Sequence, residues 1–446
     1  MINYTNKKIL ILGLGILGKG VGDAIFFAKK GAKVLVTDLK TKKQLASSLK
    51  KLAKYNNIKY ILGKHREQDV LNADLIIRNP DVPLNSPFLQ LAFKKNIPVE
   101  MDDSLFAKHC PCTLIGVTGT RGKTTTTTLI GELAKLTGRK VFVAGNIKGT
   151  ATLPLIDKVK PNDIVVLELS SWQLQGFKWD KISPHISVFT NIYPDHLNRY
   201  DSMKKYIDDK KNIFKFQKPT DFVILNKENS FTREAKKECG AQALWFEKSQ
   251  VPKTWKLKML GAHNLENAAA AMQVGKILGL TMEQMKKTIC DFPGVEHRLE
   301  HVATIKGVNF INDTTSTTPI SGQIALKTVR KPIILIAGGA TKKLNLSSFG
   351  RAISKTVKAV ALLNGTATAE LEKAIIKSGG RKLILGKFDN LLPAVRACIS
   401  TSKKGDTILL SPGCASFGIF KNEFDRGEKF KKIVKKYAKA AIRIQN

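Results

Sequence analysis

Residues 116–132 read GVTGTRGKTTTTTLIGE, and these residue types at this spacing suit a loop that holds phosphate. Gly119 and Gly122 allow backbone N–H groups to turn toward an anion. Lys123 adds a point charge, and the Thr124 hydroxyl suits a Mg²⁺ ion bound to phosphate. We therefore predict that this stretch binds the phosphates of a nucleotide.

The segments around this loop support the same interpretation. An apolar strand is expected over 113–117, and a threonine-rich helix start follows the loop. Val117 stands where the common GxxxxGK[ST] spacing has its first glycine, so the spacing departs from that pattern. A plain glycine turn would nevertheless leave the Lys-Thr pair between strand and helix unexplained.

A second glycine-rich loop lies near the N-terminus. Gly13, Gly15 and Gly18 follow a predicted strand in the GxGxxG spacing, and Asp38 ends the next strand, 20 residues after Gly18. Taken alone, this dinucleotide fingerprint favours an NAD-dependent dehydrogenase. The same loop also suits any nucleotide diphosphate that lies on a helix N-terminus. Together with the phosphate loop it predicts two nucleotide-like ligands, one in each of two domains.

Candidate metal ligands follow two further apolar strands. Glu168 ends the apolar run in VVLELSSWQL, and a carboxylate at the carboxyl end of such a strand is placed to hold Mg²⁺. The alternative for Glu168 is a solvated strand end. His196 lies beside Asp195 in TNIYPDHLNRY, where a metal ligand, a base and a structural turn histidine are all open.

Polar residues later in the chain have two interpretations each. GAHNLENAAAAM (261–272) predicts a helix start, where the amides of Asn264 and Asn267 either cap the helix or contact an adenine edge. Capping is the simpler of these. In GVEHRLE and INDTTSTTP, Arg298 suits a phosphate clamp and Asp313 suits a ribose or another arginine, and the alternative for both is a surface ion pair.

Short apolar runs alternate with helical stretches along the whole chain. Such runs, bounded by Gly, Asp or Asn, are typical of parallel strands buried on both faces. The sequence therefore predicts an α/β fold with several open sheets. Domain breaks are expected near 107–112 and near 291–300. The expected strands lie in KKILILGLG, AKVLVTD, TLIGVTG, DIVVLELS, ISVFTNI, DFVILN, KPIILIAGG, AVALLNG and DTILLSPG.

The charge balance is strongly basic. Lys and Arg number 74 against 36 Asp and Glu, which gives a net charge of +38 and raises nucleic acid as a partner. The lysines are spread along the chain and the aromatic residues, at 7%, do not cluster, so we expect no nucleic-acid partner. The densest basic run, 429–443, predicts a helix whose apolar face is formed by Phe430, Ile433, Val434, Tyr437 and Ala441.

Length and composition bound the class of protein. A chain of 446 residues suggests about two to four domains. No apolar run reaches the ~18 residues that a membrane span needs, so no membrane partner is expected. Six cysteines are few for this length and fit a reducing compartment rather than a disulfide framework.

Taken together, these motifs resemble those of the Mur ligases, ATP-dependent enzymes that add amino acids to the peptidoglycan precursor. The matching stretches occur in the family's order and span residues 10–430; they are TGTRGKTTT, GNIKG, LELSSWQL, TNIYPDHLNRY, GAHNLENAAAA, HRLE, IND and SPGCASFGIFKNEFDRG. Within the family, the N-terminal fingerprint, the length and the C-terminal stretch look most like the branch that adds D-glutamate to UDP-N-acetylmuramoyl-L-alanine. Folylpolyglutamate synthetases share the central and C-terminal layout but lack this N-terminal domain.

The resemblance implies three α/β domains: a Rossmann-like UDP-precursor-binding domain (1–107), a central ATP-binding domain (108–296) and a Rossmann-like amino-acid-binding domain (297–446). It implies transfer of the γ-phosphate of ATP to a substrate carboxylate, followed by attack of the amine of glutamate on the acyl phosphate. Carboxylate and triphosphate repel each other, so Mg²⁺ and lysine are needed to bring them together. A cytoplasmic, monomeric enzyme in peptidoglycan precursor synthesis is expected.

The resemblance also implies roles for individual residues. Lys123, Lys210 and His196 are the expected catalytic residues, and Lys210, or by a one-residue slip Lys211, matches the lysine that the family carbamylates. Two Mg²⁺ sites are expected from Thr124, Glu168, His196 and Lys210. ATP is expected to contact Gly119, Thr120, Gly122, Lys123, Thr124, Thr125, Asn267, Arg298 and Asp313. The two other substrates are expected to contact Gly15, Leu17, Asp38, Asn146, Ser170, Gln173, Thr317, Lys342, Ser416 and Phe417.

Three departures from the family pattern bear on the substrates. The usual Ser-Lys-Ala-Thr-Asn after IND is here residues 314–318, Thr-Thr-Ser-Thr-Thr, so a lysine near the acceptor amino acid is replaced by Thr315. The usual Ser-Pro-Gly of the uracil-contacting turn is Asn79-Pro80-Asp81, and Leu17 stands where a hydroxyl often touches the diphosphate. Addition of L-glutamate or of another amino acid is therefore the alternative activity.

Two other classes of function stay open on the sequence alone. A nicotinamide-dependent dehydrogenase would use the N-terminal fingerprint, but it leaves the phosphate loop unexplained. A nucleic-acid-binding ATPase would use the basic charge, and its ATPase activity would depend steeply on salt.

Overall fold

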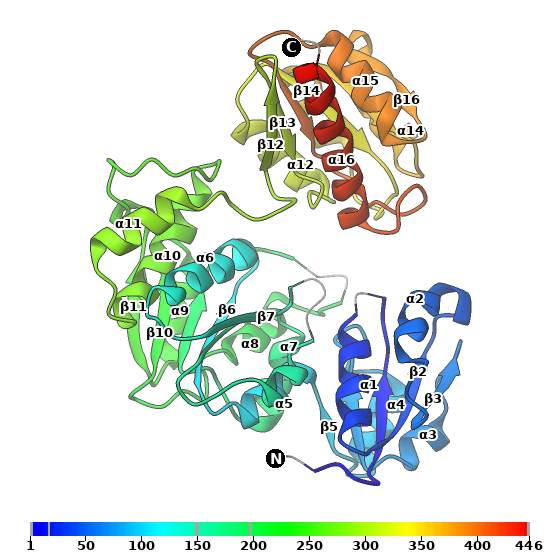
Figure 1. The fold of residues 1–446 in the computed structure, drawn as a ribbon, viewed down its shortest axis with the longest axis vertical. Helices are drawn as coiled ribbons and strands as arrows, with labels where there is room; N and C mark the ends of the chain where they lie inside the picture. The colour runs from blue at the N-terminus through cyan, green and yellow to red at the C-terminus, as the bar shows by residue number, and fades with distance from the viewer. Residues whose placement is uncertain (1–2, 17, 148–150, 196–198, 444–446) are drawn as a thin grey trace. The chain divides into compact units, whose positions relative to one another are not determined.

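The computed structural model describes residues 3–16, 18–147, 151–195 and 199–443 (Figure 1). Its described part separates into two compact units: residues 1–255 with 265–289, and residues 256–264 with 290–446. The first unit contains two sheets and the second contains one. All three sheets belong to α/β folds, as the sequence predicted.

The first sheet has the strand order β3-β2-β1-β4-β5, and all of its strands are parallel. Helices cover both faces: the core on one face includes residues of α1 and α2, and the core on the other face includes residues of α3 and α4. The strands are β1 (Lys8–Leu12), β2 (Lys33–Asp38), β3 (Ile58–Leu62), β4 (Leu75–Arg78) and β5 (Val99–Glu100); the helices are α1 (Lys19–Lys29), α2 (Lys42–Leu52), α3 (Glu67–Leu71) and α4 (Pro87–Lys94).

The second sheet is also parallel, in the order β11-β10-β9-β6-β8-β7. Helices α7 and α8 contribute to the core on one face, and α6 packs against β6, β7 and β8. The strands are β6 (Thr113–Thr118), β7 (Val141–Gly145), β8 (Ile164–Glu168), β9 (Ile186–Phe189), β10 (Phe222–Asn226) and β11 (Gln242–Phe246). The helices are α5 (Asp102–His109), α6 (Lys123–Lys135), η1 (Leu153–Asp157), α7 (Gln173–Asp180), α8 (Met203–Lys211), α9 (Ser230–Ala235), η2 (Lys236–Glu238), η3 (Lys248–Gln250), α10 (His263–Ile277) and α11 (Met282–Asp291).

The third sheet, in the second unit, has the order β12-β13-β17-β14-β15-β16. Only the β12–β13 pair is antiparallel among its described strands. Its strands are β12 (Glu300–Ile305), β13 (Val308–Asn312), β14 (Ile333–Gly338), β15 (Val357–Leu363), β16 (Ile384–Phe388) and β17 (Thr407–Leu410). Its helices are α12 (Pro319–Thr328), α13 (Ser347–Thr356), α14 (Thr368–Lys377), η4 (Arg381–Leu383), α15 (Leu391–Thr401) and α16 (Glu423–Arg443).

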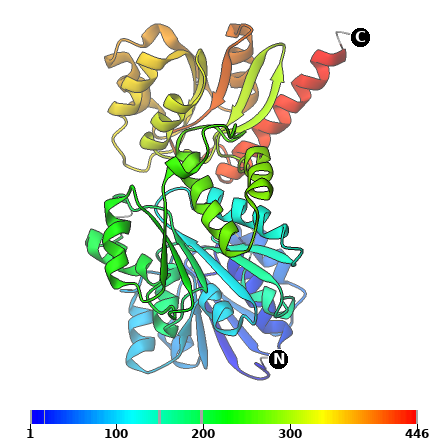
Figure 2. The ribbon, with the colours of Figure 1, turned by 90° about the vertical axis from the view of Figure 1, so that its left-hand side faces the viewer.

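The C-terminal basic run forms α16, the long helix that lies along β12 and β13 (Figure 2). Phe430 and Val434 are fully buried, and Ile433 and Tyr437 pack against the same core, so the predicted apolar face is confirmed at these four positions. The side chain of Ala441 lies outside the described residues. None of the described helices is long and apolar enough to span a bilayer.

Phe349 shows how tightly the second unit is packed. Its side chain on α13 is fully buried, and a Cβ atom added to Gly322 or Gly413 would overlap its ring. Two glycines therefore make the room that this ring fills, and a smaller side chain would leave a cavity.

We expect Phe349→Ala to lower the free energy of unfolding of the second unit by about 3–5 kcal/mol, the usual cost of removing a buried phenylalanine. All four tryptophans lie in the first unit, so tryptophan fluorescence follows that unit while circular dichroism follows both. In urea titrations the dichroism transition should shift and the fluorescence transition should not. Leu392→Ala, at an exposed position of α15, is the control; an equal shift there would contradict the argument.

Candidate active site

The phosphate loop lies between β6 and α6, as predicted. Gly119 and Gly122 have φ values of 146° and 80°, which other residues rarely adopt. A Cβ atom on Gly119 would overlap Thr190, and one on Gly122 would overlap Asn267. Because α6 begins at Lys123, the first-turn N–H groups of a helix point into the loop, where an anion is favoured.

Asn191, which follows β9, holds this loop in place. Its backbone carbonyl accepts a hydrogen bond from Thr120 N, and its side-chain Oδ1 accepts one from Arg121 N, both at 2.9 Å. The Thr120 hydroxyl lies 3.1 Å from the Tyr206 hydroxyl on α8. The loop is therefore fixed by its neighbours on both sides.

Two lysines converge on the loop's backbone. Lys123 Nζ donates to the carbonyls of Gly119 (3.0 Å) and Thr120 (3.1 Å). Lys210 Nζ, on α8, donates to the same Gly119 carbonyl at 2.9 Å and lies 3.4 Å from Thr118 Oγ1. Lys210 is 2% exposed, and burial together with the positive charge of Lys123 lowers its pKa well below the usual value.

The neighbouring Lys211 points elsewhere. Its Nζ forms an ion pair with Glu238 at 2.6 Å. Successive residues on a helix face directions about 100° apart, so only one of two adjacent lysines can reach the loop. Of the two candidates, Lys210 is the one beside the phosphate loop.

Glu168 lies at the end of β8, next to the loop. In the sheet register it pairs with Val117, the second-last residue of β6. Its carboxylate is 2% exposed; Oε1 accepts a hydrogen bond from Asn146 Nδ2 at 2.9 Å, and Oε2 has no hydrogen-bond partner among the described residues. The alternative of a solvated strand end is thus wrong. A buried carboxylate oxygen without a partner fits a cation ligand.

Ser170 and Gln173 follow Glu168 and hold each other. The Ser170 backbone N–H and hydroxyl both donate to Gln173 Oε1, at 2.8 and 2.6 Å. Gln173 Nε2 donates to Asp103 Oδ2 at 2.5 Å, and Lys19 Nζ lies 2.5 Å from the same oxygen. The sequence did not single out Lys19 or Asp103.

The N-terminal glycine loop also has the predicted form. Gly13, Gly15 and Gly18 all have positive φ. Asp38, at the end of β2, accepts hydrogen bonds from the N–H groups of Gly15 (2.9 Å) and Lys40 (2.8 Å), so both of its oxygens hold backbone. The predicted contacts at Leu17 and His196 lie outside the described residues.

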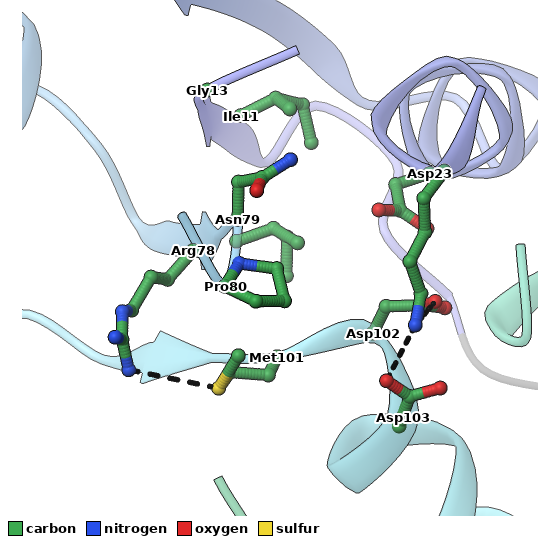
Figure 3. A pocket seen from close by; sticks show the side chains of 11 residues that line it. Ile11, Gly13, Asp23, Arg78, Asn79, Pro80, Met101, Asp102 and Asp103 are labelled. Atoms are coloured by element: carbon green, nitrogen blue, oxygen red, sulfur yellow. Dashed lines mark hydrogen bonds and ion pairs between the residues drawn. The ribbon is translucent and has the colours of Figure 1, made fainter. Parts of the chain in front are cut away.

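A small cavity lies beside the glycine loop (Figure 3). Asn79 and Pro80 line one part of it, and Asp23, Asp102 and Asp103 gather around Lys19 in another. Burial and the neighbouring carboxylates raise the pKa of Asp23 well above its usual value. Three buried carboxyl groups therefore share one lysine, which favours retention of a proton within the group.

In the second unit, Lys342 and Thr317 come together. Lys342 Nζ donates to Thr317 Oγ1 at 2.8 Å, and both residues line a small cavity. A bridge between Ala340 and Ala415 brings the 413–416 segment alongside. Ser416 is buried and its hydroxyl has no partner among the described residues, whereas Phe417 is 57% exposed; neither lines this cavity.

Thr315, which replaces the family's lysine, faces the backbone. Its hydroxyl donates to the His297 carbonyl at 2.9 Å. The turn that contains it is held by Arg426, a fully buried arginine whose guanidinium donates to Thr314 Oγ1 (3.0 Å) and to the Thr314 carbonyl (2.9 Å). Sequence reasoning passed over Arg426 because a charged residue in a lysine-rich helix is usually at the surface.

Asp313 is buried beneath this turn. Its carboxylate accepts hydrogen bonds from Ser316 Oγ (2.5 Å), Ser411 Oγ (2.8 Å) and Leu299 N (3.2 Å). Arg298 is exposed and makes no ion pair with it in the described structure, so the alternative of a surface ion pair is wrong. Burial raises the pKa of Asp313 to about 6 in spite of these hydrogen bonds.

Two other features needed the structure. Asn267 accepts a hydrogen bond from Thr126 at 3.2 Å, which places α10 against α6. Glu296, His297 and Glu428 lie close enough to offer ligand atoms to one ion, but Lys431 Nζ is 2.8 Å from Glu296 and 3.6 Å from Glu428. A lysine already supplies positive charge there.

These geometries define a nucleotide-binding α/β protein with a phosphate loop, a buried lysine and a buried carboxylate in its central sheet. Models of three domains match in succession: the Mur ligase MurD-like N-terminal domain over residues 7–100, the Mur ligase middle domain over 117–253 and the Mur ligase glutamate ligase domain over 297–414. The chain belongs to the Mur ligase family.

Individual relatives agree with this assignment. A UDP-N-acetylmuramoylalanine–D-glutamate ligase of Roseiflexus sp. is 39% identical, with 98% of this chain and 100% of the relative covered. The ligase of the same name from Alkaliphilus metalliredigens is 33% identical, covering 97% and 99%. Among solved structures, the UDP-N-acetylmuramate-alanine ligase MurC of Thermotoga maritima aligns with a TM-score of 0.62 at 20% identity, covering 97% and 99%, which supports the three-domain fold.

Because the pKa of Asp313 is raised, its contribution to the stability of the folded state should fall as the pH rises. An aspartate in the unfolded chain titrates near 3.8, so between about pH 4 and 6 the folded state binds more protons than the unfolded state. The contribution of Asp313 to the free energy of unfolding should therefore decrease by about 3 kcal/mol across that window and then level off. Asp313→Asn should remove this component.

The measurement is urea unfolding of the wild type and of Asp313→Asn from pH 4 to 8, followed by circular dichroism. The difference in free energy of unfolding between the two proteins should change between about pH 4 and 6. Loss of the carboxylate's hydrogen bonds adds only an offset that does not depend on pH. Asp389→Asn, at an exposed position of the same unit, should track the wild type. A pH-independent difference for Asp313→Asn would show that the carboxyl group does not titrate there.

Proposed function

We propose that this protein joins D-glutamate to UDP-N-acetylmuramoyl-L-alanine, with conversion of ATP to ADP and phosphate, in cytoplasmic peptidoglycan precursor synthesis. The observation that carries the proposal is the full-length similarity, 33–39%, to relatives that bear the name of this D-glutamate ligase. A phosphate loop flanked by Lys210 and Glu168 supports the ATP-dependent part of the reaction.

The reaction begins with the terminal phosphoryl group of ATP. The substrate carboxylate attacks it, and the oxygen that bridges to the β-phosphate leaves with ADP. The amine of glutamate then attacks the acyl phosphate carbon; the tetrahedral intermediate expels phosphate, and the amine loses a proton as the amide forms. Positive charge at the site offsets repulsion between carboxylate and triphosphate, and an N-terminal helix end receives the phosphates.

Lys123, Thr124 and the first-turn N–H groups of α6 are the groups proposed to hold the ATP phosphates. Lys123 donates hydrogen bonds to two carbonyls of the loop. With ATP bound, Lys123 would exchange these neutral acceptors for charged phosphate oxygens. Asn267, Arg298 and Asp313 are proposed to contact the rest of ATP. Thr120, Thr125 and the two glycines of the loop complete this set.

Glu168 and Thr124 are the residues proposed to hold the first Mg²⁺, and Glu168 Oε2, which has no hydrogen-bond partner among the described residues, fits that role. His196 and Lys210 are proposed for a second. When bound, Mg²⁺ supplies charge neutralisation between the two anions. Lys210 would contribute as its carbamate, and a buried, pKa-lowered lysine is suited to this because only the neutral amine adds to CO₂.

The substrates are proposed to divide among three domains, with boundaries at 1–107, 108–296 and 297–446. Gly15, Leu17 and Asp38 would face the UDP end, and Asn146, Ser170 and Gln173 the sugar side. Thr317, Lys342, Ser416 and Phe417 would form the glutamate pocket. The Lys342–Thr317 contact supports a carboxylate-binding position, since an anion can take the place of the hydroxyl at the ammonium group.

Phosphate release from Mg-ATP tests the proposal directly. With UDP-N-acetylmuramoyl-L-alanine present, release should occur with D-glutamate and should fall to background with L-glutamate or with no amino acid. Release with L-glutamate instead would mean that the pocket beside Thr315 selects the other isomer. Release stimulated by DNA or RNA would favour a nucleic-acid-dependent ATPase, and NADH binding would favour the dehydrogenase.

Lys210 and Lys211 form a matched pair for the catalytic site. Lys210→Ala should lower turnover by at least about 100-fold, the scale of losing one preorganised charged group. Added bicarbonate should not restore it, because the amine is gone. Lys211→Ala should retain turnover, since that lysine pairs with Glu238 outside the loop. A reversed result would place the reactive lysine at 211.

A further inference from the structure

Arg78 is an unusual buried arginine in the first unit. It ends β4, is 2% exposed, and forms no ion pair with a carboxylate of the described residues. Its Nε donates to the Val82 carbonyl at 2.8 Å, which closes the turn that contains Asn79 and Pro80. Figure 3 shows the guanidinium pointing toward Met101 and away from Asp102 and Asp103.

The other end of the guanidinium is bound by Gln175 on α7. Arg78 Nη1 donates to Gln175 Oε1 at 2.7 Å, and Gln175 Nε2 donates to Asp209 Oδ2 at 2.6 Å. The Tyr200 hydroxyl donates to the same oxygen at 3.0 Å. One buried carboxamide therefore lies between a cation and an anion, with its oxygen toward the arginine and its nitrogen toward the aspartate.

This arrangement links two distant parts of the proposed site. Asp209 directly precedes Lys210 on α8, and Lys210 Nζ bonds the Gly119 carbonyl of the phosphate loop. At the other end, Arg78, Asn79 and Pro80 line the cavity beside the N-terminal glycine loop. A continuous path of hydrogen bonds thus runs from that cavity to the helix that carries Lys210.

A buried glutamine cannot release either partner cheaply. Without Gln175, Arg78 would keep only the Val82 carbonyl and Met101 Sδ, and Asp209 only the Tyr200 hydroxyl. A buried charge with too few hydrogen bonds costs more than the lost bond itself contributed. A displacement of the 79–82 turn would therefore be passed to α7 and α8 through Gln175. If the hydrogen-bonded chain Arg78–Gln175–Asp209 has two discrete arrangements, each favoured by one state of occupancy, binding at one end depends on binding at the other.

We propose that Gln175 is a positioning residue that couples occupancy of the UDP-precursor site to ATP binding at the phosphate loop, through Arg78 on one side and Asp209 on the other. This rests on the proposed function for the identity of the two ligands. By linkage the effect is reciprocal: the precursor tightens ATP binding by the same factor by which ATP tightens precursor binding.

The test measures two dissociation constants in the full-length protein by calorimetry. A non-hydrolysable ATP analogue with Mg²⁺ is titrated with and without UDP-N-acetylmuramoyl-L-alanine, and the ratio gives the coupling. We expect a ratio within the usual range of about 5 to 150 in the wild type. In Gln175→Met the ratio should approach 1, while each ligand alone binds within about threefold of the wild type.

A matched control separates coupling from general loosening. Gln273→Met makes the same change at another buried glutamine of this unit, one whose Nε2 donates to Gln250 and takes no part in the path. Its coupling ratio should equal that of the wild type. A ratio near 1 in this control as well would overturn the assignment to Gln175.

A second variant replaces the donor group of Gln175 by an acceptor with almost no change of shape. Gln175→Glu keeps the bond to Arg78 but places a carboxylate against Asp209, so the coupling should be lost. Adding Asp209→Asn supplies an amide that donates to the new carboxylate, and the coupling should return. Failure of the folded double variant to regain coupling would overturn the inference, because the path would then be intact without its effect.

The outcomes also separate this inference from the proposed function. A wild type that binds the analogue but not the precursor overturns both. A wild type that binds both ligands without coupling, or a Gln175→Met variant that couples as well as the wild type, overturns the inference alone.

Discussion

The central parallel sheet requires its polar strand ends to lie at one edge, and the proposed site depends on that constraint. β6 lies between β8 and β9, so the phosphate loop after β6, Glu168 at the end of β8 and Asn191 after β9 must be neighbours. The inner strands β6, β8 and β9 are almost entirely buried, and the proposed functional side chains lie at their carboxyl ends or just beyond them. Chemistry is thus confined to where the backbone leaves the sheet.

Burial then determines what the charged groups at this edge can do. Lys210 is held by the Gly119 carbonyl and has no carboxylate as an ion-pair partner among the described residues, so its neutral form is favoured. Glu168 keeps a buried oxygen that no described residue hydrogen-bonds. Each group by itself is costly in a folded protein. Bound cations and anions would relieve both costs together, which explains how a destabilising arrangement can persist at a site for charged ligands.

The sequence predicted the class of fold and the phosphate loop because both depend on local patterns. All nine expected strands are present, and the lysine and glycines of the loop lie where the motif placed them. Strands with weaker apolar runs, such as β3, β11 and β16, were missed, as was the antiparallel β12–β13 pair. These strands lie at or near the edges of their sheets, where partial burial weakens the apolar pattern.

The missed residues share one property: their role comes from contacts distant in sequence. Arg426 meets Thr314, and Arg78 meets Gln175, across separations that no local motif records. Arg426 lies in a lysine-rich helix and Arg78 at the end of a strand, where a charge is usually solvated, and only the three-dimensional structure shows each guanidinium buried on neutral acceptors. Such groups are expensive to bury, so their burial requires a compensating function in holding a turn. Arg426 holds the turn that contains Thr314 and Thr315, and Arg78 holds the turn beside the glycine loop.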